Sequence, residues 1–279
     1  MTGEGAAGSA RRYVKRFDSF DRFLHFLLMV TFLGLSLTGL PLFFSTHRWA
    51  AVLANALGGF RGAGLVHRIF ATGMLACFAM HLARVAWRLV ARRDWGILWG
   101  PNSLVPQPRD LVQIYQNLRW FLGRGPRPRF DRYTYWEKFD YWAVFWGMAI
   151  IGGSGLILWF PKAFATVLPG TVFNLALLIH GEEALLAVSF IFTIHFFNSH
   201  LRPEKFPVDR VIFTGVVAEE ELREERPAEY ARLEASGDLD ALAAGPPSPR
   251  SVRRANVSAI VAVAIGLILV VLTISALLT

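Results

Sequence analysis

Two apolar stretches with regularly spaced histidines decide the fold of this chain. Residues 65–85 read LVHRIFATGMLACFAMHLARV, and residues 179–200 read IHGEEALLAVSFIFTIHFFNSH. A helix that crosses a bilayer needs roughly 20 mostly apolar residues, and both stretches reach that length. The pattern therefore predicts two membrane spans, which we place at Val66–Val90 and Phe173–His200.

Three further stretches have the same length and character. They are Asp21–Phe44, Phe139–Phe160 and Val257–Leu278. Hydrophobic residues make up 54% of the 279-residue chain and lie in long blocks, which argues against a soluble protein. We predict an all-α integral membrane bundle of four spans with a C-terminal fifth transmembrane helix. Because this last stretch has no aromatic residue and no histidine, it is predicted to be an anchor.

The basic residues are distributed unevenly along the chain, which has a net charge of +8. Five Lys and Arg residues lie before or at the start of the first span, and ten lie from Arg88 to Lys138. The connections after the first and third spans hold only Arg48, Arg61 and Lys162. Because basic residues stay on the cytoplasmic side, we predict a bacterial inner-membrane protein with a cytoplasmic N-terminus and a periplasmic C-terminus. The charge reflects topology and indicates no nucleic-acid partner.

Polar segments divide the chain into four predicted regions. These are a flexible cytoplasmic N-terminus (1–16), a four-helix membrane domain (17–215), a cytoplasmic acidic segment with a linker (216–256) and a transmembrane anchor (257–279). The membrane domain includes a cytoplasmic loop, 91–138. Within that loop, Asp110–Gly123 has the apolar spacing of a helix, which is either an amphipathic helix at the membrane surface or an ordinary packed one.

The candidate site residues are histidines. Six of the seven lie within or at the ends of predicted spans: His25, His67, His81, His180, His195 and His200. An ionisable side chain inside a bilayer is costly and by default marks a functional site. The only cysteine, Cys77, excludes a disulfide framework, a cysteine-bound iron–sulfur cluster and a CxxCH haem attachment.

The spacing of four histidines indicates haem. His67 and His81 lie about 40° apart around one helix, and His180 and His195 about 60° apart around another. Each pair spans about 21–22 Å along its helix, so one member lies in each leaflet. Both spans run from outside to inside, so His67 matches His180 in depth and His81 matches His195. Such pairs can hold two b haems by bis-imidazole ligation, whereas a zinc or di-iron site needs its ligands in one cluster.

The position of His25 leaves the ligands of the inner haem open. It lies one turn into the first span, on the inner side, and could ligate the inner haem together with His195. Alternatively, His81 and His195 ligate that haem, and His25 with His200 holds a third haem or binds quinone. His200 lies about 140° from His195 around the helix, so the two do not readily serve one porphyrin. The sequence predicts two haems, or three.

Charged residues lie beside the histidines. Arg68 and Arg84 each lie within the second span, where an arginine needs an anionic partner, and haem propionates would supply one. Glu182 and Glu183 follow His180 directly. They are predicted to carry protons, to pair with Arg68 or to face the outer water.

Four stretches of the chain resemble the cytochrome b subunits of formate dehydrogenases, nickel–iron hydrogenases and thiosulfate reductases. They are FDRFLHFLLMVTFLGLSLTGLPLFF (20–44), LVHRIFATGMLACFAMHLARV (65–85), YTYWEKFDYWAVFWG with GLILWF (133–160) and IHGEEALLAVSFIFTIHFFNSHLRPEKFPVDRVIFTG (179–215). The resemblance implies four spans around two b haems, with quinone near the inner one. It also implies that His25 and His195 hold the inner haem and His67 and His180 the outer one. The tail is similar to family members partnered with multihaem cytochromes c.

Together these patterns predict an electron-transfer subunit of a respiratory oxidoreductase complex. It would exchange electrons with quinone or quinol near the cytoplasmic side, and with a periplasmic redox subunit or multihaem cytochrome c at the other end. The segment Tyr133–Tyr141 is predicted to line the quinone entrance, and Glu137, Lys138 and Asp140 to relay protons. The alternatives are a haem-free membrane anchor and a small transporter, although the chain has no repeat with Gly/Pro-broken paired spans.

Overall fold

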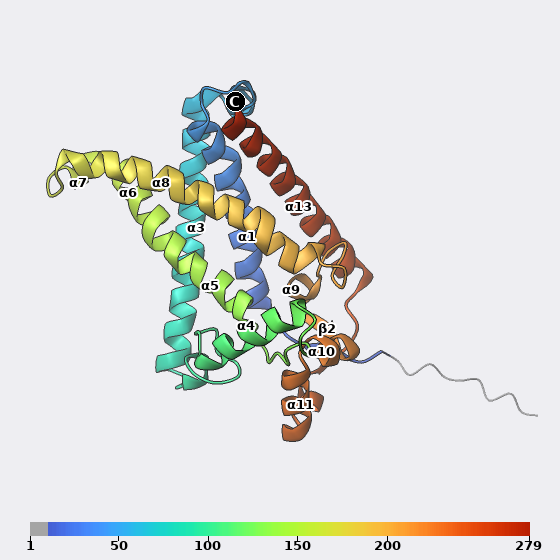
Figure 1. Cartoon of the computed structure of the whole chain (residues 1–279). Coiled ribbons are helices and arrows are strands. Elements are labelled where there is room, and N and C mark those ends of the chain that lie inside the picture. Colours follow the sequence, from blue (N-terminus) through green and yellow to red (C-terminus); the bar gives the residue numbers. More distant parts are fainter. Residues whose placement is uncertain (1–10) are drawn as a thin grey trace, which may run out of the picture. The chain divides into compact units, whose positions relative to one another are not determined.

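The computed structural model describes residues 11–279, and most of them are helical (Figure 1). Within this range five helices are long and apolar enough to cross a membrane. They are Ser19–Phe43 (α1), Gly59–Val90 (α3), Tyr135–Trp159 (α5 to α6), Gly170–Leu201 (α8 to η4) and Pro249–Leu278 (α13). The predicted helical membrane bundle with a fifth transmembrane helix is therefore confirmed.

Two of the spans contain π-helical turns. The third consists of α5 (Tyr135–Gly147), the π-helical turn η2 (Met148–Gly152) and α6 (Gly153–Trp159). The fourth consists of α8 (Gly170–Phe190) and the π-helical turns η3 (Ile191–His195) and η4 (Phe197–Leu201). Single π-helical turns change the regular backbone bonding of a helix and are frequent at functional sites. Here they lie next to or contain candidate histidines.

The chain divides into two compact units, and the larger one holds most of the spans. It comprises Phe23–Asp94, Phe139–Asp209 and Asn256–Thr279, with the short helices α2 (Arg48–Ala56) and α7 (Pro161–Phe164) in its connections. Its core is formed by apolar residues of α1, α2, the fourth span and α13: Leu40, Phe44, Ala50, Val188, Phe192, Phe196, Ala262, Leu269 and Ala276. The fifth helix thus packs against the other helices of this unit, and its role as an anchor stays a prediction.

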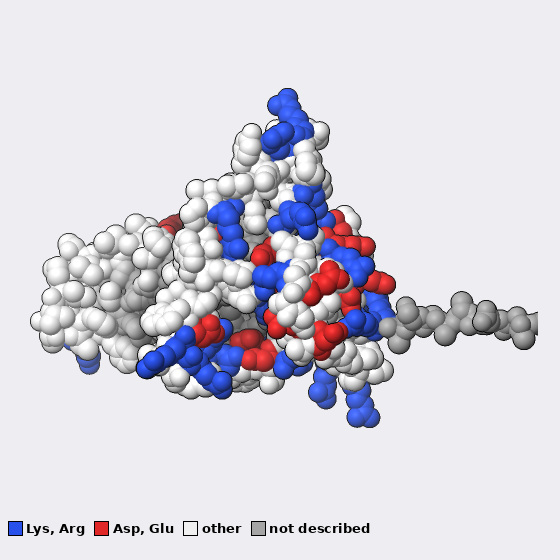
Figure 2. All heavy atoms as spheres, turned by 90° about the horizontal axis from the view of Figure 1, so that it is seen from below, with Lys and Arg blue, Asp and Glu red and all other residues white. Residues whose placement is uncertain are grey.

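The smaller unit gathers residues up to Arg22, Trp95–Lys138 and Arg210–Ala255. Its elements are β1 (Tyr13–Lys15), η1 (Trp95–Ile97), α4 (Pro108–Phe121), α9 (Val211–Thr214), β2 (Val216–Ala218), α10 (Glu219–Glu225), α11 (Pro227–Ser236), α12 (Asp238–Ala241) and β3 (Ala243–Ala244). The three strands form an antiparallel sheet in the order β2-β1-β3. Acidic and basic residues are paired repeatedly in this unit, and Figure 2 shows side chains of both charges interspersed on the surface.

The end of the N-terminal segment is ordered, in contrast to the prediction from the sequence. Residues 1–16 were predicted to be flexible, and residues 1–10 lie outside the described part of the chain. However, Tyr13–Lys15 form the central strand of the sheet, and Val14 is 3% exposed in a core with Val217, Leu222 and Tyr230. Three residues are too few for an alternating pattern that would predict a strand. The strand also depends on partners more than 200 residues away in the sequence.

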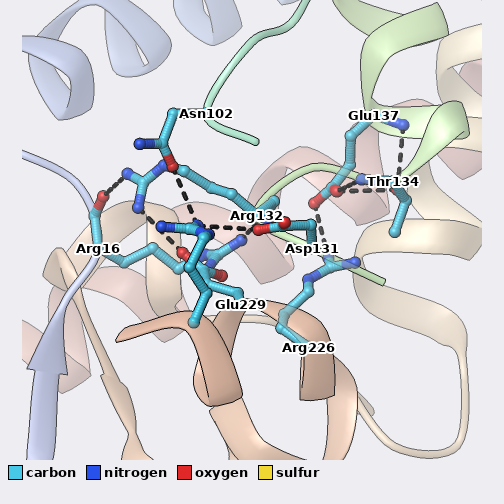
Figure 3. A network of polar contacts seen from close by, with 9 residues as sticks. Arg16, Asn102, Asp131, Arg132, Thr134, Glu137, Arg226 and Glu229 are labelled. Carbon is cyan, nitrogen blue, oxygen red and sulfur yellow. Dashed lines mark hydrogen bonds and ion pairs between the residues drawn. The ribbon is translucent and has the colours of Figure 1, made fainter. Parts of the chain in front are cut away.

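A buried ion-pair network holds the segments of the smaller unit together (Figure 3). Arg16 Nη1 donates to Glu229 Oε2 over 2.5 Å, and Arg132 Nη1 lies 3.2 Å from Glu229 Oε1. Arg16 and Arg132 also donate to each other's backbone carbonyls. Burial by itself would lower the pKa of Arg16, but Glu229 and Glu137 outweigh it, so this pKa lies above the ordinary arginine value. The arginine therefore stays charged inside the unit.

We expect Glu229→Gln to destabilise the smaller unit by about 3–5 kcal/mol, because the substitution leaves Arg16 and Arg132 buried without a counter-charge. Hydrogen–deuterium exchange of the purified chain should then show faster exchange in β1 and α11. Glu220→Gln is the matched control, since its ion pair with Arg11 is exposed and contributes little. Equal exchange in both variants would contradict the structural role of the network.

Candidate haem sites

His67 and His180 face each other within the larger unit. His67 lies on α3 and His180 on α8, and their ring centres are 6.3 Å apart with an interplanar angle of 78°. Two imidazoles on opposite sides of one metal ion have ring centres about 6 Å apart, since each metal–nitrogen bond is about 2 Å and each nitrogen lies roughly 1 Å from its ring centre. The pair that the sequence matches in depth thus has the spacing that a bis-imidazole haem requires.

The hydrogen bonds of these two histidines orient the rings. His180 Nδ1 lies 2.9 Å from the carbonyl oxygen of Ile151 in the π-helical turn η2. A carbonyl only accepts hydrogen bonds, so Nδ1 carries the proton and Nε2 keeps its lone pair for a metal. His67 Nδ1 lies 2.9 Å from Thr38 Oγ1, whose own proton is directed to the Gly34 carbonyl at 2.7 Å. His67 therefore also donates from Nδ1 and presents Nε2.

Glycines allow the rings to lie close to neighbouring helices. A Cβ atom at Gly155 would lie 2.9 Å from His180 Cε1, and one at Gly39 would lie 3.1 Å from His67 Cε1. Both distances are shorter than ordinary carbon–carbon contacts, which are about 3.5–4.0 Å. The helix backbones at these two positions thus form the surfaces against which the imidazoles pack.

We expect Gly155→Ala to lower the haem content of this site, because the new methyl group displaces the His180 ring from its hydrogen bond with Ile151, and Nε2 of that ring would ligate the haem iron. The measurement is the ratio of b haem to protein in the purified chain. Gly153→Ala is the matched control on the same helix, since a Cβ there has nothing within 4 Å. Equal haem content in both variants would mean that the ring position does not depend on Gly155.

The second group of histidines contains His25, His195 and His200. His25 interacts electrostatically with both His195 and His200, and all three belong to the larger unit. His195 Nδ1 lies 2.9 Å from Asp140 Oδ2 of α5. Because the carboxylate accepts this hydrogen bond, His195 also presents Nε2, as a metal ligand would. Asp140, which the sequence analysis assigned to proton relay, is in direct contact with this candidate ligand.

His81 has different surroundings. Its Nε2 atom lies 2.9 Å from the Tyr141 hydroxyl, and its ring packs against Tyr141 and Phe145. In His81, the nitrogen that would ligate iron in the other candidates is therefore hydrogen-bonded to a tyrosine hydroxyl. This hydrogen bond argues against His81 as a ligand, and the pairing of His25 with His195 stays a prediction.

His200 is buried at the end of the fourth span, with 7% of its surface exposed. Its Nδ1 atom accepts a hydrogen bond from the backbone N–H of Asp209 at 3.2 Å. In the neutral ring the proton then resides on Nε2, so this nitrogen can donate a hydrogen bond but cannot bind a metal. The geometry does not favour the third haem that the sequence analysis left open.

The comparison with known proteins identifies the family. A family model described as prokaryotic cytochrome b561 matches residues 16–201, which is more than half of the chain. The chain belongs to the prokaryotic cytochrome b561 family. Similar relatives include the cytochrome b556(Fdn) subunits of nitrate-inducible formate dehydrogenase from Escherichia coli K12, Escherichia coli O157:H7 and Shigella flexneri. Each is 20% identical over 181 residues, which cover 64% of this chain and 75% of the relative.

As a prokaryotic cytochrome b561, the chain is a multi-pass inner-membrane cytochrome b of electron transport, and its family implies haem b. The resemblance found in the sequence motifs is thereby confirmed. The side chains present also fit this cofactor, because the structure provides paired imidazoles with free Nε2 atoms and glycine-lined surfaces beside them.

The charged residues of this cytochrome b561 have contacts that the sequence did not predict. The Arg68 guanidinium lies 5.9 Å from the centre of the Trp159 ring, and Glu183 Oε2 accepts a hydrogen bond from Trp146 Nε1 at 3.2 Å. Arg84 is partly buried one turn after His81 on α3. The roles of both arginines toward haem propionates stay predictions.

The sequence did not reveal the residues that contact the Nδ1 atoms of His67 and His180. They are Thr38, Ile151 and Ser154, and the last lies 3.3 Å from His180 Nδ1. Thr38 and Ser154 are polar residues inside apolar spans, and this feature could have marked them as partners of the histidines. The sequence could not indicate the Ile151 carbonyl, because this backbone oxygen lies in a π-helical turn that the sequence does not predict.

Proposed function

We propose that this cytochrome b transfers electrons between the quinone pool and a periplasmic redox partner through two b haems. His67 and His180 would hold the outer haem, and His25 and His195 the inner one. The single observation that carries this proposal is the His67–His180 pair, whose ring spacing and hydrogen bonds suit one metal between two Nε2 atoms. A bound haem would accept and release one electron at a time.

We further propose that quinone or quinol binds near the inner group of histidines. Oxidation of a quinol releases two electrons and two protons, so a quinol site needs groups that bind oxygen atoms and accept protons. His200 presents an Nε2–H donor there, and Asp140 offers a carboxylate next to His195. Tyr141 adds a hydroxyl that is hydrogen-bonded to His81. An inhibitor-bound structure with the inhibitor only beside His67 and His180 would overturn this assignment.

The orientation is part of the proposal. The distribution of Lys and Arg supports a cytoplasmic N-terminus and a periplasmic C-terminus, with the inner haem at the cytoplasmic side. The partner would be a dehydrogenase or reductase subunit or a multihaem cytochrome c. An alkaline phosphatase fused after Thr279 should be active, because that enzyme folds in an oxidising compartment. An inactive but stable fusion would reverse the orientation.

The decisive experiment is a reduced-minus-oxidised spectrum of the purified chain with a pyridine haemochrome assay. We expect a b-type spectrum, two haems per chain and reduction of the haems by added quinol. A haem-free membrane anchor or a small transporter would give no b-type spectrum. Three bis-imidazole haems per chain would instead require six ligands, including both His81 and His200, against the hydrogen bonds described above.

A further inference from the structure

Helix α4 has its polar face turned inward and its apolar face turned outward. Its buried residues are Asp110 and Asn117, with 5% exposed surface each. Leu111, Tyr115 and Leu118 are 71%, 61% and 56% exposed, and they lie on one side of the helix at the spacing of a helical face. An ordinary surface helix of a soluble domain has the opposite arrangement, with its apolar stripe against the core.

The buried polar face is fastened to the first turn of a membrane span. Lys138 Nζ lies 2.8 Å from both carboxylate oxygens of Asp110, and Asn117 Nδ2 donates to the Tyr135 hydroxyl at 2.7 Å. Tyr135 and Lys138 belong to the first turn of α5, where the span Tyr135–Trp159 begins. These contacts lie within the smaller unit and join α4 to the first turn of α5.

The charge of this region suits anionic lipid headgroups. The only acidic residue of α4 is Asp110, and it is already paired with Lys138. Arg119 lies over the Tyr115 ring with 5.8 Å to its centre, and Arg127 lies over the Trp120 ring with 5.6 Å. A cationic helix with outward apolar and aromatic side chains is the arrangement of helices that lie in the headgroup region.

Two exposed tryptophans precede α4 in the chain and are also typical of a membrane surface. Trp95 and Trp99 are 63% and 65% exposed in the connection that precedes the helix. Tryptophan and tyrosine are enriched where a membrane meets water, because their rings have both an apolar body and a polar group. In water this set of exposed side chains would be unfavourable, and in the headgroup region it is stabilised.

We propose that α4 is an interfacial helix of this membrane protein: Leu111, Tyr115 and Leu118 enter the acyl–headgroup boundary, and the arginines at its C-terminal end bind anionic phospholipid. The Asp110–Lys138 ion pair then sets the depth of the helix relative to the span. We assign the lipid bilayer to the apolar face because the opposite face of α4 is hydrogen-bonded to Tyr135 and Lys138, in the first turn of a helix that is long and apolar enough to cross a membrane. The proposal is independent of haem ligation and of quinone.

The test uses the full chain with haem, carrying Cys77→Ala and one nitroxide-labelled cysteine. The chain is reconstituted into vesicles of phosphatidylcholine with phosphatidylglycerol, without a partner protein. The labelled positions are Leu118→Cys on α4, Leu186→Cys on the exposed surface of the fourth span, and Glu224→Cys on α10 as the water-facing control. Power saturation compares collisions with oxygen, which concentrates in lipid, and with a water-soluble nickel chelate.

We expect the label at position 118 to collide with oxygen more than with the nickel chelate, as the label at position 186 does. Access to the chelate equal to that at position 224 would overturn the proposal. Low access to both reagents would also overturn it, because a second copy of the chain would then cover the surface. In vesicles of phosphatidylcholine alone we expect a shallower position, and an unchanged depth would overturn the role of the arginines.

Discussion

His195→Ala is expected to abolish the spectral signal of the inner b haem and to leave the outer haem in place. His195 is common to both ligand schemes that the sequence allows, and its Nδ1 bond to Asp140 leaves Nε2 as the ligand atom. Removing an axial imidazole removes half of the axial ligation, so we expect one haem per chain instead of two. Potentiometric titration of the purified variant should then show a single b-haem transition. A variant that kept both b-haem signals would defeat the model.

His25→Ala and His81→Ala separate the two schemes for the inner haem. Because His25 interacts with His195 while His81 Nε2 is bonded to Tyr141, we expect the inner haem to be lost only in His25→Ala. His200→Ala should keep both haems and impair quinol-dependent reduction, since its Nε2 is a donor rather than a ligand. Loss of a haem in His81→Ala with retention in His25→Ala would support the depth-matched scheme instead.

The membrane spans could be predicted from the sequence because the bilayer imposes a length and a composition that a single window of residues reveals. Their ends could not. The second span was predicted from Val66, yet α3 begins at Gly59, and the fifth was predicted from Val257, yet α13 begins at Pro249. A helix continues past the hydrocarbon region, where hydropathy no longer distinguishes it from a loop.

The sequence could predict the depth of each candidate histidine, because depth depends only on the position of the residue along its own helix. Periodicity placed His67 and His180 at one depth, and the structure brings their rings together. The same argument matched His81 with His195, but the contacts described for His81 are with Tyr141 and Phe145. Depth along an axis does not give the rotation of one helix against another, and that rotation decides which rings meet.

The smaller unit was the least predictable part. Arg16, Arg132 and Glu229 come from three segments that are 97 to 213 residues apart, and the sequence analysis assigned them to three separate regions. Each is an ordinary charged residue in its local sequence. Their pairing becomes visible only when the sheet brings the N-terminal segment and the acidic segment together.

His67→Ala and His180→Ala should each remove the outer haem while the protein stays inserted in the membrane. The two rings are 6.3 Å apart, and each is oriented by an Nδ1 hydrogen bond to a different helix, so neither can replace the other. The matched control is His47→Ala, since His47 contacts Thr46 and Phe44 outside this pair.

Rescue distinguishes a ligand from a structural residue. In His67→Gly the ring is gone and its space is open, so free imidazole should enter, bind the iron and restore the low-spin spectrum of the outer haem. If the histidine only packed against Gly39, imidazole would restore no spectrum, because packing needs no metal–nitrogen bond. Absorbance of the reduced outer haem against imidazole concentration provides the measurement. Full haem content in His67→Ala and His180→Ala without imidazole would refute this ligand pair, whichever residues hold the inner haem.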